Sequence, residues 1–272
     1  MDTALDEWSD IDIDREPGYD TSFDDEYERF REKIKDSERF DAEAGVFDEP
    51  TLKTLYKLVN DDVFDAIGRP ISTGKEADIY QAVKHENGER IDLALKIYRI
   101  NTSSFDEMRY YLEGDPRFDD IHGIKKDVVI AWVKKEASNL RRAAAADVRV
   151  PKPVGAERNV LAMEYLGTER NRAPEIRDVE LTNPETAYGV VKEYLKRMYR
   201  AGLVHGDLSE YNLLVQADDI VVIDMGQAVT VHHPNSRELL VNDCRNVARY
   251  FKSLGVESPP RELLDEVLEV RD

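Results

Sequence analysis

Apolar residues first recur at helical spacing shortly after residue 50. Four of them fall three or four positions apart, which places them on one face of a helix: Leu52, Leu55, Val59 and Val63. Residues 68–70, Gly-Arg-Pro, follow, and glycine and proline both interrupt helices. We therefore predict a helix over residues 52–63, followed by a break at residues 68–70.

The pattern then changes to one that is typical of strands. Residues 77–83 and 91–98 are rich in β-formers, and His85–Glu89 between them contains the Asn-Gly pair of a tight hairpin turn. Residues 160–167 alternate in polarity and end in glycine. We predict an antiparallel hairpin from the first two segments, and from the third an edge strand that leads into a hinge.

A longer helical pattern covers residues 130–146. Its apolar face consists of Ile130, Val133, Ala137, Leu140 and Ala144. Glu136 lies on that same face, and a carboxylate that points into a core is costly unless it is paired. Glu136 therefore either has a cationic partner or lies at the rim of the stripe and reaches water. Further helices are expected over residues 184–201 and 236–254.

Charge and composition limit the class of protein. The chain has 272 residues and a formal net charge of −19, and its first 50 residues contain 19 acidic and 6 basic side chains. This composition favours a solvated, partly disordered acidic tail over a dedicated binding arm. The single cysteine, Cys244, excludes a disulfide framework, and no apolar run approaches roughly 20 residues. Acidic residues follow Met1, so we expect no leader segment. We expect a cytoplasmic protein without a membrane partner.

Residues 71–80, I-S-T-G-K-E-A-D-I-Y, are similar to part of a phosphate-binding loop. A Walker A loop needs Ser or Thr after its lysine and leads into a helix, whereas here Glu76 follows Lys75 and a strand pattern comes next. A loop that covers phosphates between two antiparallel strands is the kinase arrangement. Of the three glycines of a kinase loop, only Gly74 is present.

The kinase interpretation requires further residues, and the sequence contains them. The second strand of the hairpin carries Lys96 in the run Leu-Ala-Leu-Lys, and this lysine is the partner that we predict for Glu136. Residues 204–214, V-H-G-D-L-S-E-Y-N-L-L, keep the spacing H-x-D-x-x-x-x-N, and a D-x-G begins at Asp224. Asp207 can accept or orient a hydroxyl proton, while the oxygens of Asn212 and Asp224 can share Mg²⁺. Each of these motifs occurs often by chance. The complete set in this order, Lys96, Glu136, Asp207, Asn212 and Asp224, rarely does.

Several segments together resemble the RIO family of atypical serine kinases. They are S-T-G-K-E-A-D-I-Y, A-L-K-I-Y, Y-L-E-G-D-P-R-F, M-E-Y-L-G, H-G-D-L-S-E-Y-N-L-L and I-D-M-G-Q-A-V, and the first is similar to the type-1 branch, in an archaeal-like chain. The resemblance implies an α+β, two-lobed protein-kinase-like fold. A β-rich N-lobe would span residues 51–167 and a small helical C-lobe residues 168–272, after an acidic tail at 1–50.

The resemblance also implies a site for ATP with Mg²⁺ or Mn²⁺. Phosphates would meet the Ser72 hydroxyl, the backbone of residues 73–74 and Lys75, and the adenine edge would meet backbone groups of Glu164 and Leu166. The apolar walls of the adenine pocket would be Ile71, Ala94, Met163, Leu214 and Ile223. On sequence alone, such residues fit a plain core better than a pocket.

The chain also departs from ordinary protein kinases. Gly206 replaces the arginine that reads a phosphorylated activation loop, Ser209 replaces the catalytic-loop lysine, and no A-P-E follows Asp224, after which 48 residues remain. We therefore expect no peptide-binding platform. Residues 101–123 are polar and contain Gly114, and we predict a mobile insertion, either functional or inert.

The function that this pattern favours is Mg²⁺-dependent transfer of the ATP γ-phosphate to serine, including autophosphorylation, or to water. The resemblance implies a switch role in small ribosomal subunit maturation, with pre-small-subunit particles of RNA and protein as partners. Basic pairs at residues 125–126, 134–135 and 141–142 could meet RNA phosphates, but solvated helix faces explain them better.

Two other classes of protein stay open. A small-molecule phosphotransferase, similar to those that act on aminoglycosides, uses the same catalytic spacing but would need an acidic helical substrate lobe after Asp224. A catalytically weak assembly scaffold would be expected to lack one of the four residues Lys96, Asp207, Asn212 or Asp224, and all four are present.

Overall fold

The computed structural model describes residues 47–100, 105–118, 124–168 and 171–271. The chain divides into two compact units after Tyr56. The described part of the first unit contains the start of helix α2 (Glu49–Asn60). Asp48 caps the first turn of this helix, because the Asp48 side chain accepts the Thr51 N–H at 3.0 Å. Helix α2 ends three residues before the predicted limit, and most of the predicted acidic tail lies outside the described residues. The remaining description concerns the second unit.

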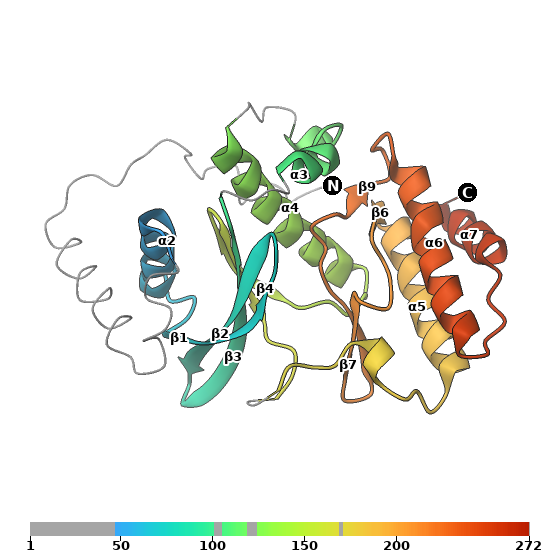
Figure 1. Ribbon diagram of the computed structural model, residues 1–272, viewed down its shortest axis with the longest axis horizontal. Helices are drawn as coiled ribbons and strands as arrows, with labels where there is room; N and C mark the ends of the chain where they lie inside the picture. Colours follow the sequence, from blue (N-terminus) through green and yellow to red (C-terminus); the bar gives the residue numbers. More distant parts are fainter. Residues whose placement is uncertain (1–46, 101–104, 119–123, 169–170, 272) are drawn as a thin grey trace, which may run out of the picture. The chain divides into compact units, whose positions relative to one another are not determined.

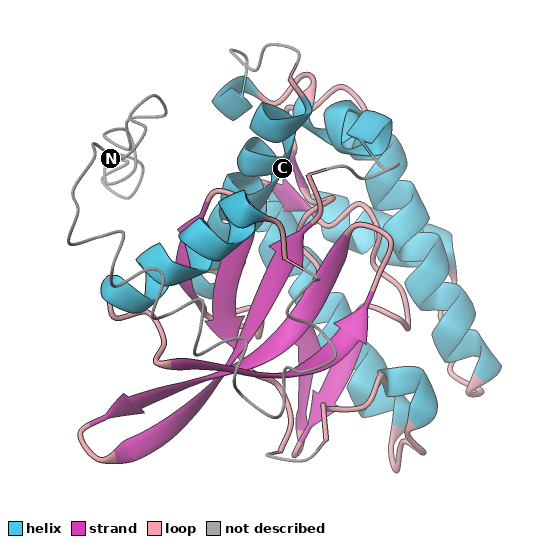
Figure 2. Cartoon of the chain, turned by 60° about the vertical axis from the view of Figure 1, so that its left-hand side comes forward, coloured by secondary structure: helices cyan, strands magenta, loops and turns pink. Residues whose placement is uncertain are grey.

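A five-stranded antiparallel sheet forms the N-lobe (Figure 2). Its strands are β1 (Ala66–Thr73), β2 (Ala77–Glu86), β3 (Glu89–Tyr98), β4 (Pro153–Glu157) and β5 (Val160–Glu164), and they lie in the order β1-β2-β3-β5-β4. The predicted hairpin joins β2 to β3. Its turn has positive φ at both Asn87 (53°) and Gly88 (83°), as a two-residue turn of the mirror-image type requires.

Two sequence predictions about this sheet are wrong. Residues 68–70 do not form a break but lie inside β1, where Pro70 sits at an irregularity in the register with β2. An edge strand with a bulge tolerates proline, because its missing N–H does not interrupt an inner ladder. Strand β5 is not an edge strand, since it lies between β3 and β4. Strand β4, which precedes β5 in the chain, takes the edge instead. The tertiary fold decides this order, because it places β5 against β3.

Helix α4 (Lys125–Ala145) begins five residues earlier than predicted. Its buried face is also wider than the predicted stripe, since it includes Val129 and Trp132, while Ala144 is exposed. The predicted mobile insertion is partly regular: it contains helix α3 (Phe105–Leu112) and the short 3₁₀ helix η2 (Pro116–Phe118). Its residues 101–104 and 119–123 lie outside the described chain.

The C-lobe contains three main helices, which lie side by side in Figure 1: α5 (Pro184–Arg200), α6 (Ser236–Ser253) and α7 (Pro260–Leu268). Short 3₁₀ helices occur at η3 (Ile176–Asp178) and η4 (Glu269–Arg271). Two small sheets pair β6 (Leu203–Val204) with β9 (Val229–Thr230), and β7 (Leu213–Gln216) with β8 (Asp219–Val222). Within the described ranges, no helix has the length and apolarity that crossing a bilayer requires.

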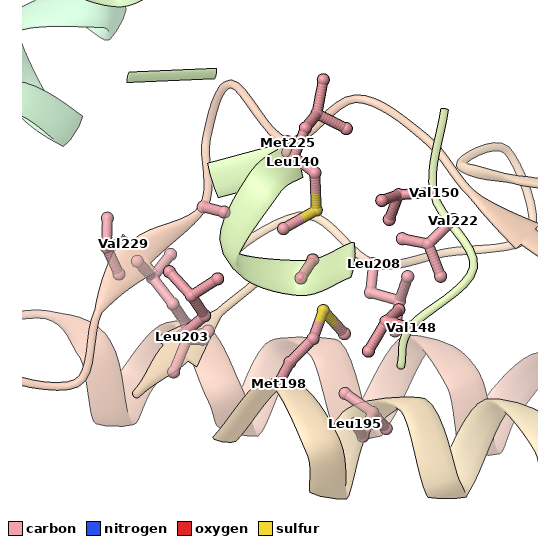
Figure 3. Packing of buried hydrophobic residues seen from close by; sticks show 14 of the residues in the cluster. Leu140, Val148, Val150, Leu195, Met198, Leu203, Leu208, Val222, Met225 and Val229 are labelled. Atoms are coloured by element: carbon pink, nitrogen blue, oxygen red, sulfur yellow. The ribbon is translucent and has the colours of Figure 1, made fainter. Parts of the chain in front are cut away.

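The main hydrophobic core joins α4 to the C-lobe (Figure 3). Leu140 of α4 and Met198 of α5 belong to the same cluster as Leu208 and Met225, which come from loops. Leu208 and Met225 have no exposed surface. Because each lies next to a predicted site residue, Asp207 or Asp224, the core fixes where the two polar side chains stand.

Candidate active site

Lys96 lies at the centre of the candidate site. It is on β3, with 9% of its surface exposed, and its Nζ donates to Glu136 Oε1 at 2.7 Å and to Asp224 Oδ1 at 2.9 Å. The predicted contact between Lys96 and Glu136 is therefore present. Glu136 is 1% exposed, and its second carboxylate oxygen accepts a hydrogen bond from the Tyr98 hydroxyl. The alternative in which Glu136 reaches water is thereby excluded.

Burial and mutual charge set the protonation of this cluster. Burial alone would lower the pKa of Lys96, but the carboxylates of Asp224 and Glu136 hold it well above its ordinary value. Burial raises the pKa of Glu136, against the effect of the Lys96 ammonium. Desolvation also acts to raise the pKa of Asp224, yet the charge of Lys96 outweighs it and the pKa is lowered. Lys96 therefore stays cationic between two carboxylates.

Asp207 and Asn212 lie on the loop between β6 and β7. The Asn212 side-chain amide donates to the Asp207 carbonyl oxygen at 2.8 Å and to its carboxylate Oδ2 at 3.1 Å. Partial desolvation raises the pKa of Asp207, while the Asn212 hydrogen bond lowers it and the charge of Asp224 raises it further. The net direction is upward, and a carboxylate of raised pKa is a better proton acceptor.

His205 connects the two loops of the site. Its ring is fully buried, its Nε2–H donates to the Ile223 carbonyl oxygen at 3.1 Å, and its Nδ1 accepts the Asp207 N–H at 3.3 Å. Burial lowers the pKa of His205, which matches the neutral ring that this pair of hydrogen bonds requires. His205 thus links the residue before Asp224 to Asp207 without carrying charge.

Asp243 of α6 is a site residue that the sequence reasoning missed. It has no exposed surface, and its two carboxylate oxygens accept the N–H groups of Gly206 at 2.9 Å and Leu208 at 2.8 Å. Burial raises its pKa to about 7, against these hydrogen bonds. The available signal was the same as for Glu136, namely an acid on the apolar face of a helix, here between Leu240 and Val247.

Asn212 and Asp224 have the chemistry that a magnesium site needs. The Ile223 N–H donates to the Asn212 carbonyl oxygen at 3.0 Å, which keeps the two segments adjacent. The Asp224 side chain is half exposed, and its backbone lies in the left-handed region, with φ of 60°. The described residues contain no group of three or more His, Cys, Asp or Glu that could hold a metal. This arrangement fits Mg²⁺, which takes one or two protein oxygens together with phosphates and waters.

The predicted phosphate loop is the turn between β1 and β2. Ile71 and Ser72 are half-buried, whereas residues 73–75 are exposed, and the Gly74 N–H donates to the Ala77 carbonyl oxygen at 3.0 Å and closes the turn. Its path from strand to strand agrees with the kinase arrangement and not with a Walker loop.

The predicted adenine-binding residues come from β1, from β3, from β5 and the residues after it, from β7, and from the residue after β8. Ala94 and Met163 face each other across β3 and β5, and Leu166, Leu214 and Ile223 belong to one small apolar cluster apart from the main core. The Glu164 carboxylate accepts the Arg149 guanidinium at 2.6 and 2.9 Å and the Lys152 backbone N–H at 3.2 Å, so its side chain is already engaged within the protein. The Leu166 carbonyl oxygen accepts the Ala173 N–H at 2.9 Å.

Gly167, which follows Leu166, adopts a backbone conformation that requires glycine. Its φ is 144°, and a Cβ there would come within 2.3 Å of the Asn171 carbonyl oxygen. Only glycine allows the chain to turn so tightly between the sheet and the C-lobe.

The fold and the site together define a two-lobed, protein-kinase-like protein. A family model described as "RIO domain" matches residues 78–263, and the chain belongs to that family. It is 51% identical to a "RIO-type serine/threonine-protein kinase Rio1" of Haloferax volcanii, over 96% of this chain and 90% of the relative. A protein of the same name in Methanocaldococcus jannaschii is 34% identical, over 97% and 87%.

A solved structure supports the fold independently of close sequence similarity. It is described as the Rio2 kinase–ADP/Mg²⁺–phosphoaspartate complex from Chaetomium thermophilum, and it superposes with a TM-score of 0.59 at 21% identity. The match covers 80% of this chain and 70% of that chain. At this identity the likeness concerns the fold alone.

Proposed function

We propose that this protein is a RIO-type serine/threonine-protein kinase that transfers the γ-phosphate of ATP to serine, including its own, or to water. One observation carries the proposal: Lys96 joins Glu136 of α4 to Asp224 of the loop beside Asn212, in a family whose curated relatives are named as such kinases. Lys96 holds phosphate oxygens, and Glu136 orients Lys96.

The remaining roles follow from the chemistry of each group. Asp207 orients the attacking hydroxyl or water and accepts its proton, in keeping with its raised pKa. Asn212 and Asp224 hold Mg²⁺, for which Mn²⁺ could substitute, and this ion neutralises phosphate charge when bound. Ile71, Ala94, Met163 and Leu214 enclose the adenine, and backbone groups of Glu164 and Leu166 meet its edge. Ser72 and Lys75 contact phosphates.

Transfer of γ-labelled ATP tests this function directly. Asp207→Ala should lower phosphoryl transfer by about 100-fold or more, the usual range for loss of a positioned base, and leave Mg²⁺·ATP affinity within about twofold. Asp224→Ala should weaken both. Asp218, an exposed acid in the turn between β7 and β8, is the matched control, and Asp218→Ala should behave as the unmodified protein. Full activity of Asp207→Ala would disprove its role.

Asp224 has a second proposed role as an acceptor of phosphate. Its carboxylate oxygen would attack the γ-phosphorus while the bond to the β-bridging oxygen breaks and ADP leaves. Water would then attack the same phosphorus, which releases inorganic phosphate and restores the carboxylate. The half-exposed side chain and the solved Rio2 complex, whose description names a phosphoaspartate, support this proposal.

Hydroxylamine separates the two kinds of phosphorylated product, because it cleaves acyl phosphates and leaves phosphoserine intact. Label that hydroxylamine removes from the unmodified protein, and that is missing from Asp224→Ala, is the expected result. Label that resists hydroxylamine in both proteins would rule out the aspartyl phosphate, although serine transfer would stand.

The cellular role that we propose is a switch in small ribosomal subunit maturation, in the cytoplasm, with pre-small-subunit RNA and protein as partners. The basic pairs support an RNA contact only weakly, as the sequence analysis expects, and Lys135 does not lie on a solvated helix face. Lys135 has no exposed surface, and the Arg142 Nε donates to the Ala201 carbonyl oxygen at 2.7 Å. Binding to purified precursor particles, measured with and without Mg²⁺·ATP, tests this role. We also propose residue 167 as the end of the N-lobe.

A further inference from the structure

The segment Gly-Asp-Pro-Arg-Phe, residues 114–118, has no part in the function proposed above, yet it carries a buried ion pair. Asp115 has no exposed surface, and it accepts the Arg117 guanidinium at 2.7 Å on Oδ2 and 3.0 Å on Oδ1, as well as the Arg117 N–H at 3.1 Å. Burial opposes ionisation of Asp115, but Arg117 outweighs it and lowers its pKa. The pair holds the Arg117 side chain in one direction.

That direction leads to Asn139 of α4. Arg117 Nη1 donates to Asn139 Oδ1 at 3.1 Å and lies 3.3 Å from the Ser138 hydroxyl. Asn139 is fully buried, and its Nδ2 donates to the carbonyl oxygens of Met225 at 2.9 Å and Ala228 at 2.7 Å. A guanidinium has only donors and carbonyls only accept, so Arg117 fixes which end of the Asn139 amide faces the loop.

A second side chain of α4 contacts the same loop. Lys135 has no exposed surface, and its Nζ donates to the Gly226 carbonyl oxygen at 2.6 Å. Trp132 lies beside it, with its ring 5.0 Å from the Lys135 Nζ and so close to Gly226 that a Cβ there would come within 2.9 Å of the indole. Side chains of α4 therefore hold three carbonyl groups of residues 225–228, directly after Asp224.

We propose that Asp115, Arg117 and Asn139 form a relay that positions the metal-binding loop, so that the insertion between β3 and α4 is a working part of the Mg²⁺ site. Arg117 and Asn139 are positioning residues, because their contacts run to the backbone after Asp224 and not to its carboxylate. The relay rests on the proposed function, since it acts through the Mg²⁺ that Asp224 holds. It assigns the insertion a role in the affinity for the metal.

The first test measures how much Mg²⁺ is needed for half-maximal turnover at saturating ATP. In Asn139→Leu and Arg117→Met this concentration should rise about tenfold, as outer partners of metal ligands usually produce, while the KM for ATP at saturating Mg²⁺ stays within about twofold. Arg117→Lys keeps a charge beside Asp115 and should give an intermediate value. Arg109→Met, which removes an exposed pair with Glu113 on the same insertion, is the control and should not change it.

The second test needs no turnover. In a Trp8→Phe background Trp132 is the only tryptophan, and its emission should report the loop as Mg²⁺ is added in the presence of ADP. In Asn139→Leu and Arg117→Met the midpoint of this Mg²⁺ titration should shift by the same factor as the Mg²⁺ concentration for half-maximal turnover. Before Mg²⁺ is added, the emission of both variants should match that of the unmodified protein. If either variant melts below the assay temperature, Arg117→Lys decides.

The outcomes distinguish the two proposals. Unchanged midpoints in folded Asn139→Leu and Arg117→Lys would overturn the relay and leave the kinase function intact. If the unmodified protein binds and turns over no Mg²⁺·nucleotide, the proposed function itself fails.

Discussion

At the scale of single residues, Lys96 determines the state of the site. Its ammonium lies between Glu136, which is almost fully buried, and Asp224, whose side chain is half exposed. A buried carboxylate without a cation is strongly disfavoured, so Glu136 depends on Lys96 at least as much as Lys96 depends on Glu136. Removing Lys96 leaves Glu136 without this cation, and removing Glu136 leaves Lys96 held by Asp224 alone, which makes Lys96 and Glu136 one functional unit.

We expect Lys96→Met and Glu136→Gln to be non-additive in catalysis. The double variant should lose little more than the worse single variant, with a coupling free energy of about 1–3 kcal/mol in kcat/KM, because each single change already breaks the contact. Arg109 of α3 and Glu113, the residue after this helix, form an exposed pair and provide the control cycle, for which coupling should be close to zero. Additive losses in the Lys96 cycle would contradict the pairing.

At the scale of elements, helix α6 supports the catalytic loop. Asp243 lies on the buried face of α6 and accepts the N–H groups on both sides of Asp207, so this loop takes its shape from a helix later in the chain. The cost of this arrangement is a buried carboxylate, which appears as a pKa raised to about 7. The catalytic loop and the stability of α6 are therefore connected through one side chain.

This connection predicts a pH dependence of stability. Between pH 4 and 7 the folded protein keeps a proton on Asp243 that the unfolded chain releases, so the Asp243 contribution to the free energy of unfolding falls as pH rises. The slope should approach about 1.4 kcal/mol per pH unit within this window and vanish above it. Asp243→Asn cannot titrate, so the difference between unmodified and variant protein in urea unfolding should show the slope.

The control for this experiment is Glu238→Gln, an exposed acid in the first turn of α6. It should reproduce the pH dependence of the unmodified protein. A difference between the unmodified protein and Asp243→Asn that is flat from pH 4 to 7 would contradict the raised pKa of Asp243.

At the scale of the whole molecule, the short path from Asp224 to α6 distinguishes this protein from ordinary protein kinases. Helix α6 begins at Ser236, 12 positions after Asp224, and β9 occupies two of the residues between them. A long activation segment has no room in this interval. This short interval agrees with a phosphotransfer core that lacks a peptide platform after Asp224.

We expect generic serine peptides to be poor acceptors. Because the described interval between Asp224 and α6 is too short for a segment that holds an extended peptide, kcat/KM for an unrelated serine peptide should be at least about 100-fold below that of an ordinary protein kinase; the missing contacts are those that position the hydroxyl. Parallel assays with γ-labelled ATP, with and without peptide, would measure transfer to peptide, protein and water. Efficient transfer to an unrelated peptide would contradict this architecture.

The sequence by itself determined the chemistry of the site. The β2–β3 hairpin followed from Asn87-Gly88, a turn that only residues tolerant of positive φ adopt readily, and the pairing of Lys96 with Glu136 followed from the cost of an acid on an apolar helix face. These inferences succeed because spacing and local conformation are properties of short segments. They identify which side chains can do chemistry without giving their surroundings.

The tertiary structure alone decided what supports those side chains. The inner position of β5, the anchoring of the catalytic loop by Asp243 and the contacts from Arg117 through Asn139 to Met225 all join residues far apart in sequence. No local pattern specifies such partners, since a buried polar group needs only some partner, and packing of the whole chain selects which one. For the same reason the sequence predicted a mobile loop over residues 101–123, although Asp115 within this insertion is buried.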